Sequence, residues 1–338
     1  MANDRSSVRW GILSTAKIGL EKVIPGISRS QTGIAAAIAS RDLGRAKSTA
    51  SELGIEKAYG SYEELLADPD IDAIYNPLPN HMHVPLTVQA VEAGKHVLCE
   101  KPIALSADEA RQLLDLPKDK LVAEGFMVRA HPQWIRAREI VRSGALGELR
   151  AIQSFFSYFN ADPGNIRNKA DIGGGALLDI GCYPMVAGRY FFEAEPTRVL
   201  SLIDRDPDFG TDRLSSALLD FGQGRRLDFT VSTQLVPYQR INLVGTKARL
   251  EIMIPYNAPQ SEEVLIRLDD GTGFADLTAK SETIGSSDQY AKLIDVFGRA
   301  TRGEIDLPYG PADAVQNMAI LDALFASEKA DGWASIDN

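Results

Sequence analysis

The chain has 338 residues, of which 44% are hydrophobic and 24% are charged, so it suits two globular domains rather than a disordered or fibrous protein. The formal net charge of -10, with no cluster of lysine and arginine, argues against nucleic acid as a partner. The two cysteines, Cys99 and Cys182, form no CxxC or CxxH pair and indicate neither a zinc site nor a disulfide framework. We find no signal peptide and no apolar run approaching the ~18 residues of a membrane span, and we expect a cytoplasmic protein.

The first 125 residues alternate short apolar runs with helical patterns. The expected strands are Val8–Leu13, Ile34–Ala39, Lys57–Tyr59, Ile71–Tyr75, His96–Cys99 and Leu121–Ala123. The expected helices are Lys17–Arg29 with a kink at Pro25, Leu43–Leu53, Tyr62–Leu66, Val84–Ala93 and Ala107–Leu114. Strands separated by helices of this length form βαβ units, so the pattern predicts an α/β N-terminal Rossmann domain over residues 1–125, with a parallel sheet and helices on both faces.

The pattern changes after Gly125. Helices are expected at His131–Arg142, Gly175–Phe192, Asp288–Ala300 and Pro311–Ser327, and strands at Leu149–Phe159, Arg226–Ser232, Arg240–Val244 and Arg249–Ile254. Strands in succession without intervening helices favour an antiparallel sheet. We therefore expect an α+β C-terminal domain over residues 126–338 with a mainly antiparallel sheet, and its last helix packing back on the first domain.

The turn after the first strand runs from Ser14 through Thr15, Ala16, Lys17 and Ile18 to Gly19. A dinucleotide fingerprint has glycines at the first, third and sixth of these positions, and here Ser14, Ala16 and Gly19 stand there, all of them small. Small residues allow the backbone to approach a pyrophosphate, and the helix start offers free N–H groups. The turn alone is weak evidence, but its position in a βαβ pattern favours a cofactor site.

The end of the second strand discriminates between cofactors. NAD enzymes usually place a carboxylate there for the ribose hydroxyls, whereas this chain has Ser40-Arg41-Asp42, with Arg45 following. One hydroxyl and two guanidinium groups suit a 2′-phosphate, which favours NADP. Asp42 keeps NAD open as the alternative.

Two further segments carry candidate chemistry. Glu100-Lys101-Pro102 ends the strand His96–Cys99, at the edge where open α/β sheets bind ligands. In Gly173–Pro184, three glycines precede an apolar helix, so the backbone must pass close to something. Asp179 and Tyr183 are four residues apart and share a helix face unless Pro184 breaks the helix. A nearby ammonium lowers the pKa of a tyrosine, so Tyr183 and Lys101 are a workable proton-transfer pair. His81 and His83 lack a third ligand, and we predict no metal site.

Taken in order, the turn Ser14–Gly19, the loop Tyr75–His83, the strand end Ala93–Pro102 and the segment Gly173–Pro184 resemble the Gfo/Idh/MocA family of oxidoreductases. The resemblance runs from Val8 to about Ser327. Many members have a histidine in place of Tyr183. A tyrosine there resembles the branch with glucose-fructose oxidoreductase, dimeric dihydrodiol dehydrogenase and NADP-dependent xylose dehydrogenases. The family implies an open, mainly antiparallel sheet in the C-terminal domain and a homodimer or homotetramer built on one sheet face.

The resemblance also implies roles. Lys101 lies beside the nicotinamide and the substrate hydroxyl, Tyr183 exchanges the proton, and Asp179 binds a substrate hydroxyl. Together, the turn, the strand end and the resemblance give the expected cofactor-binding residues: Ser14, Thr15, Ala16, Lys17, Ile18, Ser40, Arg41, Arg45, Pro77, Leu78, Asn80, His83, Glu100, Lys101 and Arg167.

The sequence thus predicts an NADP-dependent enzyme that transfers hydride to or from a sugar or polyol-like substrate. Two alternatives stay open: an oxidoreductase for trans-dihydrodiols or dicarbonyls, and a non-catalytic regulator that senses the dinucleotide.

Overall fold

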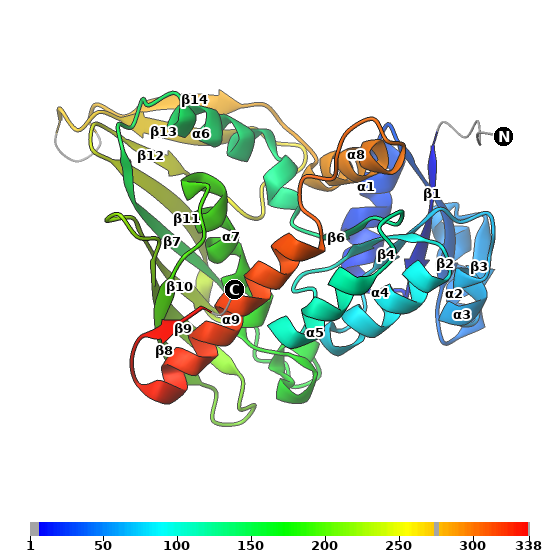
Figure 1. The fold of residues 1–338 in the computed structure, drawn as a ribbon. Coiled ribbons are helices and arrows are strands. Elements are labelled where there is room, and N and C mark those ends of the chain that lie inside the picture. The colour runs from blue at the N-terminus through cyan, green and yellow to red at the C-terminus, as the bar shows by residue number, and fades with distance from the viewer. Residues whose placement is uncertain (1–6, 274–276, 337–338) are drawn as a thin grey trace. The chain divides into compact units, whose positions relative to one another are not determined.

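The computed structural model describes residues 7–273 and 277–336 and divides the chain into two compact units (Figure 1). Unit 1 comprises the described residues up to Met127 together with Asp288–Val315. Unit 2 comprises Val128–Ser287 and the described residues from Gln316 onward. The segment 288–315, which we expected in the second domain, therefore belongs to unit 1. Within the described ranges, no helix is long and apolar enough to cross a membrane.

Unit 1 is built on a six-stranded parallel sheet in the order β3-β2-β1-β4-β5-β6. Its strands are β1 (Val8–Leu13), β2 (Gly33–Ala39), β3 (Lys57–Tyr59), β4 (Ala73–Asn76), β5 (His96–Cys99) and β6 (Val122–Glu124). The chain builds outward from β1 through β2 to β3 and then returns to β4 on the other side of β1. This reversal between β1 and β4 is the switch point where open α/β sheets bind ligands.

The helices of unit 1 follow the predicted pattern with one irregularity. They are α1 (Ile24–Arg29), α2 (Leu43–Leu53), α3 (Tyr62–Leu66), α4 (His83–Glu92), α5 (Ala107–Arg111) and α8 (Gln289–Thr301), with short 3-10 turns at Asn80–Met82 and Gln112–Asp115. The helix expected over Lys17–Arg29 contains a π-helical segment, η1 (Gly19–Val23), just before Pro25. Helix α8 lies beside α1 (Figure 1). It joins unit 1 through Phe297, whose ring centroid is 5.3 Å from that of Trp10 on β1.

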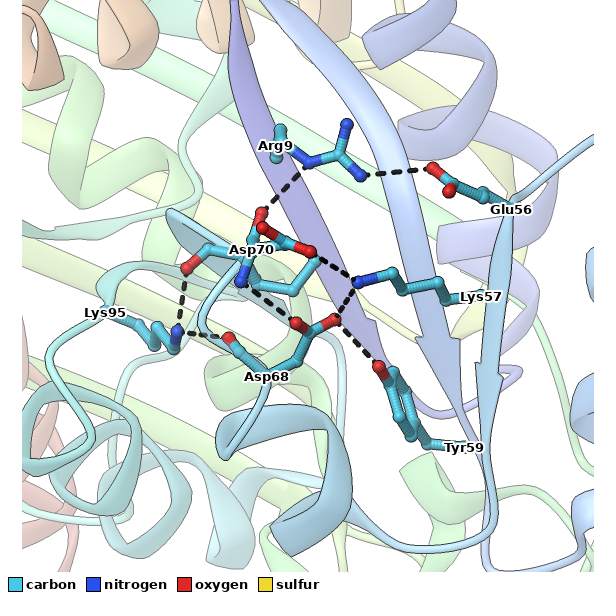
Figure 2. Close-up of polar contacts among 8 residues, drawn as sticks. Arg9, Glu56, Lys57, Tyr59, Asp68, Asp70 and Lys95 are labelled. Carbon is cyan, nitrogen blue, oxygen red and sulfur yellow. Dashed lines mark hydrogen bonds and ion pairs between the residues drawn. The ribbon is translucent and has the colours of Figure 1, made fainter. Parts of the chain in front are cut away.

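A polar network lies at the amino-terminal ends of the strands of this sheet (Figure 2). Lys57 on β3 donates to Asp68 and Asp70 at 2.8 and 3.0 Å, and Tyr59 donates to the same Asp68 oxygen at 2.7 Å. Lys95, 5% exposed, donates to the carbonyls of Asp68 and Ile71 at 2.6 and 2.8 Å. These contacts fix the segment that enters β4 and leave the carboxyl ends of the strands for ligands.

Unit 2 is built on a nine-stranded sheet in the order β14-β13-β12-β11-β7-β10-β9-β8-β15. Its strands are β7 (Leu149–Phe159), β8 (Arg198–Arg205), β9 (Asp212–Asp220), β10 (Arg226–Ser232), β11 (Gln234–Gly245), β12 (Arg249–Ile252), β13 (Val264–Asp269), β14 (Lys280–Ile284) and β15 (Ala334–Ser335). Neighbouring strands are antiparallel except for β7 and β10, which pair in parallel. The predicted fold class, an α/β Rossmann domain plus an α+β domain with a mainly antiparallel sheet, is confirmed.

Helix α6 (Pro132–Arg142) packs on β12 and β13, and α7 (Cys182–Phe192) packs on β7 and β10. The remaining helical elements are the 3-10 turns Met127–Ala130, Ile166–Asn168 and Ala170–Ile172, the π-helical segment η7 (Leu177–Gly181) and the final helix α9 (Pro311–Ala330). Pro184 does not break the helix that carries Tyr183. It stands in the first turn of α7, where its missing N–H costs little, and the irregularity is the wider turn of η7 that precedes it.

Candidate active site

The turn after β1 has the geometry of a phosphate-binding turn. Ser14 has a left-handed backbone with φ 73°, and its Oγ accepts the Ala16 N–H at 3.2 Å. The first helical hydrogen bond runs from Leu20 N–H to Ala16 O at 3.1 Å, so the N–H groups of the first turn come before the helical ladder. A Cβ on Gly19 would lie 3.6 Å from Tyr75, an ordinary contact. Packing within the protein therefore does not require this glycine.

The end of β2 leaves its guanidinium groups exposed. Ser40 is 8% exposed, and its Oγ accepts the Asp42 N–H at 3.2 Å. Asp42 caps α2 by accepting the Arg45 N–H at 3.1 Å, so this carboxylate already has a structural task. Arg41 and Arg45 are both exposed.

His83 connects the loop after β4 with the turn after β5. It is 1% exposed, and its Nδ1 and Nε2 lie 2.7 Å from Pro102 O and 2.6 Å from Leu78 O. Burial lowers the pKa of His83 to about 4, with a further contribution from the Lys101 charge. A neutral ring carries one N–H and donates to only one of these carbonyls, whereas donation to both would need the protonated ring that burial disfavours. Pro77 and Leu78 are also buried, and Asn80 is partly buried.

The turn after β5 holds Lys101, partly exposed, before a cis peptide bond to Pro102. Glu100 accepts the Tyr75 hydroxyl at 2.7 Å and the Lys101 N–H at 3.4 Å. Burial raises the pKa of Tyr75 well above its usual value, and Glu100 adds to the effect. Tyr75 was not among the predicted site residues. The available signal was a tyrosine near the carboxyl end of a buried strand adjacent to β1.

In unit 2, Tyr158, Arg167 and Asp179 form what we name the Asp179 cluster. Asp179 Oδ2 accepts the Tyr158 hydroxyl at 2.5 Å and Arg167 Nε–H at 2.9 Å. The side chain of Asp179 is 13% exposed and that of Arg167 is 43% exposed. The Asp179 charge raises the pKa of Arg167, while burial, followed by Asp179, raises that of Tyr158. Both partners therefore keep their protons. Arg167, expected at the cofactor or substrate, pairs with Asp179. The contact of Tyr158 with Asp179 was not predicted, because the sequence showed Tyr158 only within an apolar strand that could be core or could line a pocket.

Aromatic side chains pack around Tyr183. It is 5% exposed, and its ring centroid lies 5.8 Å from that of Phe156 and 5.3 Å from that of Tyr256. Tyr256 is fully buried, and its hydroxyl is 2.5 Å from Ser154 Oγ. Phe156 on β7 and Tyr256 in the loop after β12 thus pack against the ring of Tyr183.

The predicted site residues gather into two sets, one in each unit. In unit 1 they follow the carboxyl ends of β1, β2, β4 and β5, and in unit 2 they lie on η7, on α7 and on the turn Ile166–Asn168. The π-helical segment η1 begins at the last residue of the turn Ser14–Gly19, and η7 contains Asp179 and ends two residues before Tyr183. Such segments are frequent at functional sites. Among residues 7–273 and 277–336, no three His, Cys, Asp or Glu side chains are grouped to hold a metal ion.

A parallel sheet with a ligand-binding switch point, followed by a largely antiparallel domain with an Asp–Tyr pair, defines a dinucleotide-dependent oxidoreductase. Residues 8–126 match the family model described as "Oxidoreductase family, NAD-binding Rossmann fold", and residues 134–251 match the "GFO/IDH/MocA C-terminal domain". The chain belongs to the Gfo/Idh/MocA family of oxidoreductases, as the resemblance predicted.

Relatives match along nearly the whole chain. An uncharacterized oxidoreductase of Rhizobium meliloti is 44% identical over 332 residues, covering 97% of this chain and 99% of the relative. The NADP(+)-dependent D-xylose 1-dehydrogenase 2 of Haloferax volcanii is 37% identical, again covering 97% and 99%. Among solved structures, the 3-ketoreductase KijD10 of Actinomadura kijaniata, in complex with NADP and TDP-benzene, has a TM-score of 0.88 at 28% identity and covers 95% of this chain and 98% of that chain.

Proposed function

We propose that this oxidoreductase is NADP-dependent and transfers hydride between the nicotinamide and a hydroxyl or carbonyl carbon of a sugar or polyol-like substrate. The observation that carries the proposal is the Asp179 cluster, which holds a hydroxyl-binding carboxylate four residues before Tyr183. The xylose dehydrogenase relative and the ketoreductase neighbour support both the cofactor and the substrate class. The nicotinamide, when bound, supplies or accepts the hydride.

Proton transfer falls to Tyr183. In oxidation its hydroxyl oxygen takes the proton of the substrate hydroxyl, and in reduction it returns that proton to the carbonyl oxygen. The ammonium group of Lys101 stabilises the negative charge that develops on the oxygens. Asp179, held by Tyr158 and Arg167, accepts a hydrogen bond from a neighbouring substrate hydroxyl and orients the reacting carbon.

The preference for NADP rests on Ser40, Arg41 and Arg45. Two exposed guanidinium groups and a hydroxyl suit the 2′-phosphate, and Asp42, the competing carboxylate, caps α2. Replacing Arg41 with alanine should weaken NADPH binding at least tenfold and leave NADH binding within twofold, as measured by titration of cofactor fluorescence. Arg9→Ala, a change at the amino-terminal end of β1, is the control. Equal losses for both cofactors would contradict the assignment to the 2′-phosphate.

The substrate class is tested by Tyr183→Phe. We expect the rate of cofactor reduction with a panel of aldoses and polyols to fall about 10²- to 10⁴-fold, while the Kd for NADPH stays within twofold. Tyr238→Phe, a change at a 46% exposed tyrosine, is the matched control. Wild-type turnover by Tyr183→Phe would remove the assignment of Tyr183.

The same panel separates the alternatives. Turnover of trans-dihydrodiols or dicarbonyls in preference to sugars would favour the second enzyme activity. Tight NADPH binding without turnover of any compound would favour a dinucleotide sensor.

A further inference from the structure

The three glycines at 173–175 mark a close approach of the backbone to a buried carboxylate. Gly175 has a left-handed backbone with φ 120°, and a Cβ on it would overlap Asp212 Oδ1. A Cβ on Gly174 would come within 2.6 Å of Arg167 O and 2.7 Å of Lys169 O. The first approach brings Asp212, the first residue of β9, directly against the start of the segment that bears Asp179 and Tyr183.

Asp212 binds the beginning of that segment. Its Oδ2 accepts the Leu177 N–H at 2.7 Å and the Ser215 hydroxyl at 3.2 Å, and the residue is 2% exposed. Leu177 is the first residue of η7, and the bond from Asp179 N–H to Gly175 O, 3.1 Å, closes the first turn across it. A carboxylate in this position accepts a hydrogen bond from an N–H that has no partner within the helix. Its negative charge also interacts favourably with the positive end of the helix dipole.

We infer that Asp212 is a positioning residue: its carboxylate anchors the start of η7 to β9 and thereby sets where Asp179 and Tyr183 stand during turnover. The part of this role that concerns turnover rests on the proposed function. The anchoring itself rests on the contacts of Asp212 alone. Asp179 is two positions after Leu177, so a shift of the anchored end moves Asp179 against Tyr158 and Arg167.

The electrostatics of Asp212 fit such a role better than a stabilising one. Burial raises the pKa of Asp212 to about 6, although the Leu177 N–H, the Ser215 hydroxyl and the Arg205 charge on β8 all act in the opposite direction. Arg205 is itself paired with Glu328 of α9 at 2.6 Å. Since the folded pKa lies above the unfolded one, the ionised carboxylate disfavours folding above about pH 6. Asparagine at this position, which removes the charge and keeps an acceptor for the Leu177 N–H, should therefore not lower stability at pH 7.5.

The test compares Asp212→Ala and Asp212→Asn with Asp206→Ala. Asp206 is 7% exposed, and it accepts the Asp208 and Phe209 N–H groups at 2.8 and 3.0 Å in the turn before β9. It is thus a matched buried carboxylate that binds backbone N–H groups away from η7. Each variant is examined by hydrogen exchange of peptides covering 177–183, by NADPH titration, and by steady-state kinetics between pH 5 and 8.

For Asp212→Ala we expect faster exchange confined to 177–183, a kcat reduced at least tenfold, and an NADPH Kd within twofold of wild type. Asp212→Asn keeps an acceptor for Leu177 N–H but lacks the charge. It should be intermediate, with unchanged or higher Tm at pH 7.5. The wild-type kcat should fall toward that of Asp212→Asn below about pH 6, and this step should be missing from the variant. Asp206→Ala should lose stability and keep kcat within twofold.

Unchanged exchange at 177–183 in Asp212→Ala overturns the anchoring, and faster exchange with kcat and KM both within twofold overturns its catalytic relevance. A wild-type chain that turns over no compound of the panel defeats the proposed function. In that event the exchange measurement still decides the anchoring by itself.

Discussion

Replacing Asp68 with asparagine should measure how much the polar network at the amino-terminal ends of the strands of unit 1 contributes to stability (Figure 2). Burial alone raises the pKa of Asp68, but hydrogen bonds from Lys57, the Asp70 N–H and Tyr59 outweigh it and lower the pKa from 3.8 to about 2. That shift corresponds to about 2 kcal/mol. The side chains of Lys57 and Asp70 are 25% and 49% exposed, and solvent screening reduces the value. We therefore expect Asp68→Asn to lower the free energy of unfolding by about 1–2 kcal/mol at pH 7.

The pH dependence follows from the direction of the shift. Because the folded pKa of Asp68 lies below its unfolded value, the contribution is fully present above about pH 4 and is lost as the pH falls toward 2. The difference between wild type and Asp68→Asn should be constant from pH 5 to 8 and should shrink below pH 4.

Urea unfolding followed by circular dichroism gives both quantities, with the transition of unit 1 separated from that of unit 2 if the two units unfold independently. Asp70→Asn is the matched control, since Asp70 shares Lys57 and is far more exposed, and it should cost less than about 0.5 kcal/mol. A loss below about 0.5 kcal/mol for Asp68→Asn, or a difference that persists undiminished at pH 3, would refute the reasoning.

Three further predictions concern unit 2. Tyr158→Phe removes the 2.5 Å hydrogen bond to Asp179, and a hydrogen bond to a charged acceptor contributes about 1.5–3 kcal/mol. The kcat/KM should therefore fall at least tenfold while NADPH binding stays unchanged. A twofold effect on kcat/KM would contradict this prediction. Gly175→Ala should yield little folded protein because its Cβ would overlap Asp212, whereas Gly54→Ala, at φ 68° with nothing within 4 Å, should cost about 1 kcal/mol. The homodimer or homotetramer implied by the family remains a prediction: Leu202, 77% exposed on β8, changed to aspartate should give monomers in light scattering. An unchanged assembly would place the interface elsewhere.

The elements of unit 1 were largely predictable because each strand is an apolar run bounded by turn residues. The predicted bounds of β1, β3, β5, α2 and α3 coincide with those of the structure. The helix α8 was also predicted, but its place in unit 1 was not. Nothing local in Gln289–Thr301 specifies that Phe297 packs on Trp10, since this contact joins residues nearly 290 positions apart in sequence.

The irregular turns were not predictable from periodicity. A five-residue π segment changes the helical repeat for only one turn, too briefly to alter the apolar pattern of η1 or η7. The parallel pairing of β7 with β10 was missed for a related reason. Successive strands suggest antiparallel neighbours, but β10 lies between β9 and the much earlier β7.

The pairing of Arg167 with Asp179 bears on the substrate class that we propose. The family resemblance implied that Arg167 binds the cofactor or the substrate. In the structure its charge is paired with Asp179, and the second donor to the same oxygen, Tyr158, is neutral. A guanidinium and a carboxylate joined at 2.9 Å offer little net charge but several directed hydrogen-bonding atoms. Such a cluster suits the hydroxyl groups of a sugar better than a phosphate or carboxylate at the reacting end. Selectivity for a sugar acid over its neutral aldose would therefore contradict this account of the Asp179 cluster.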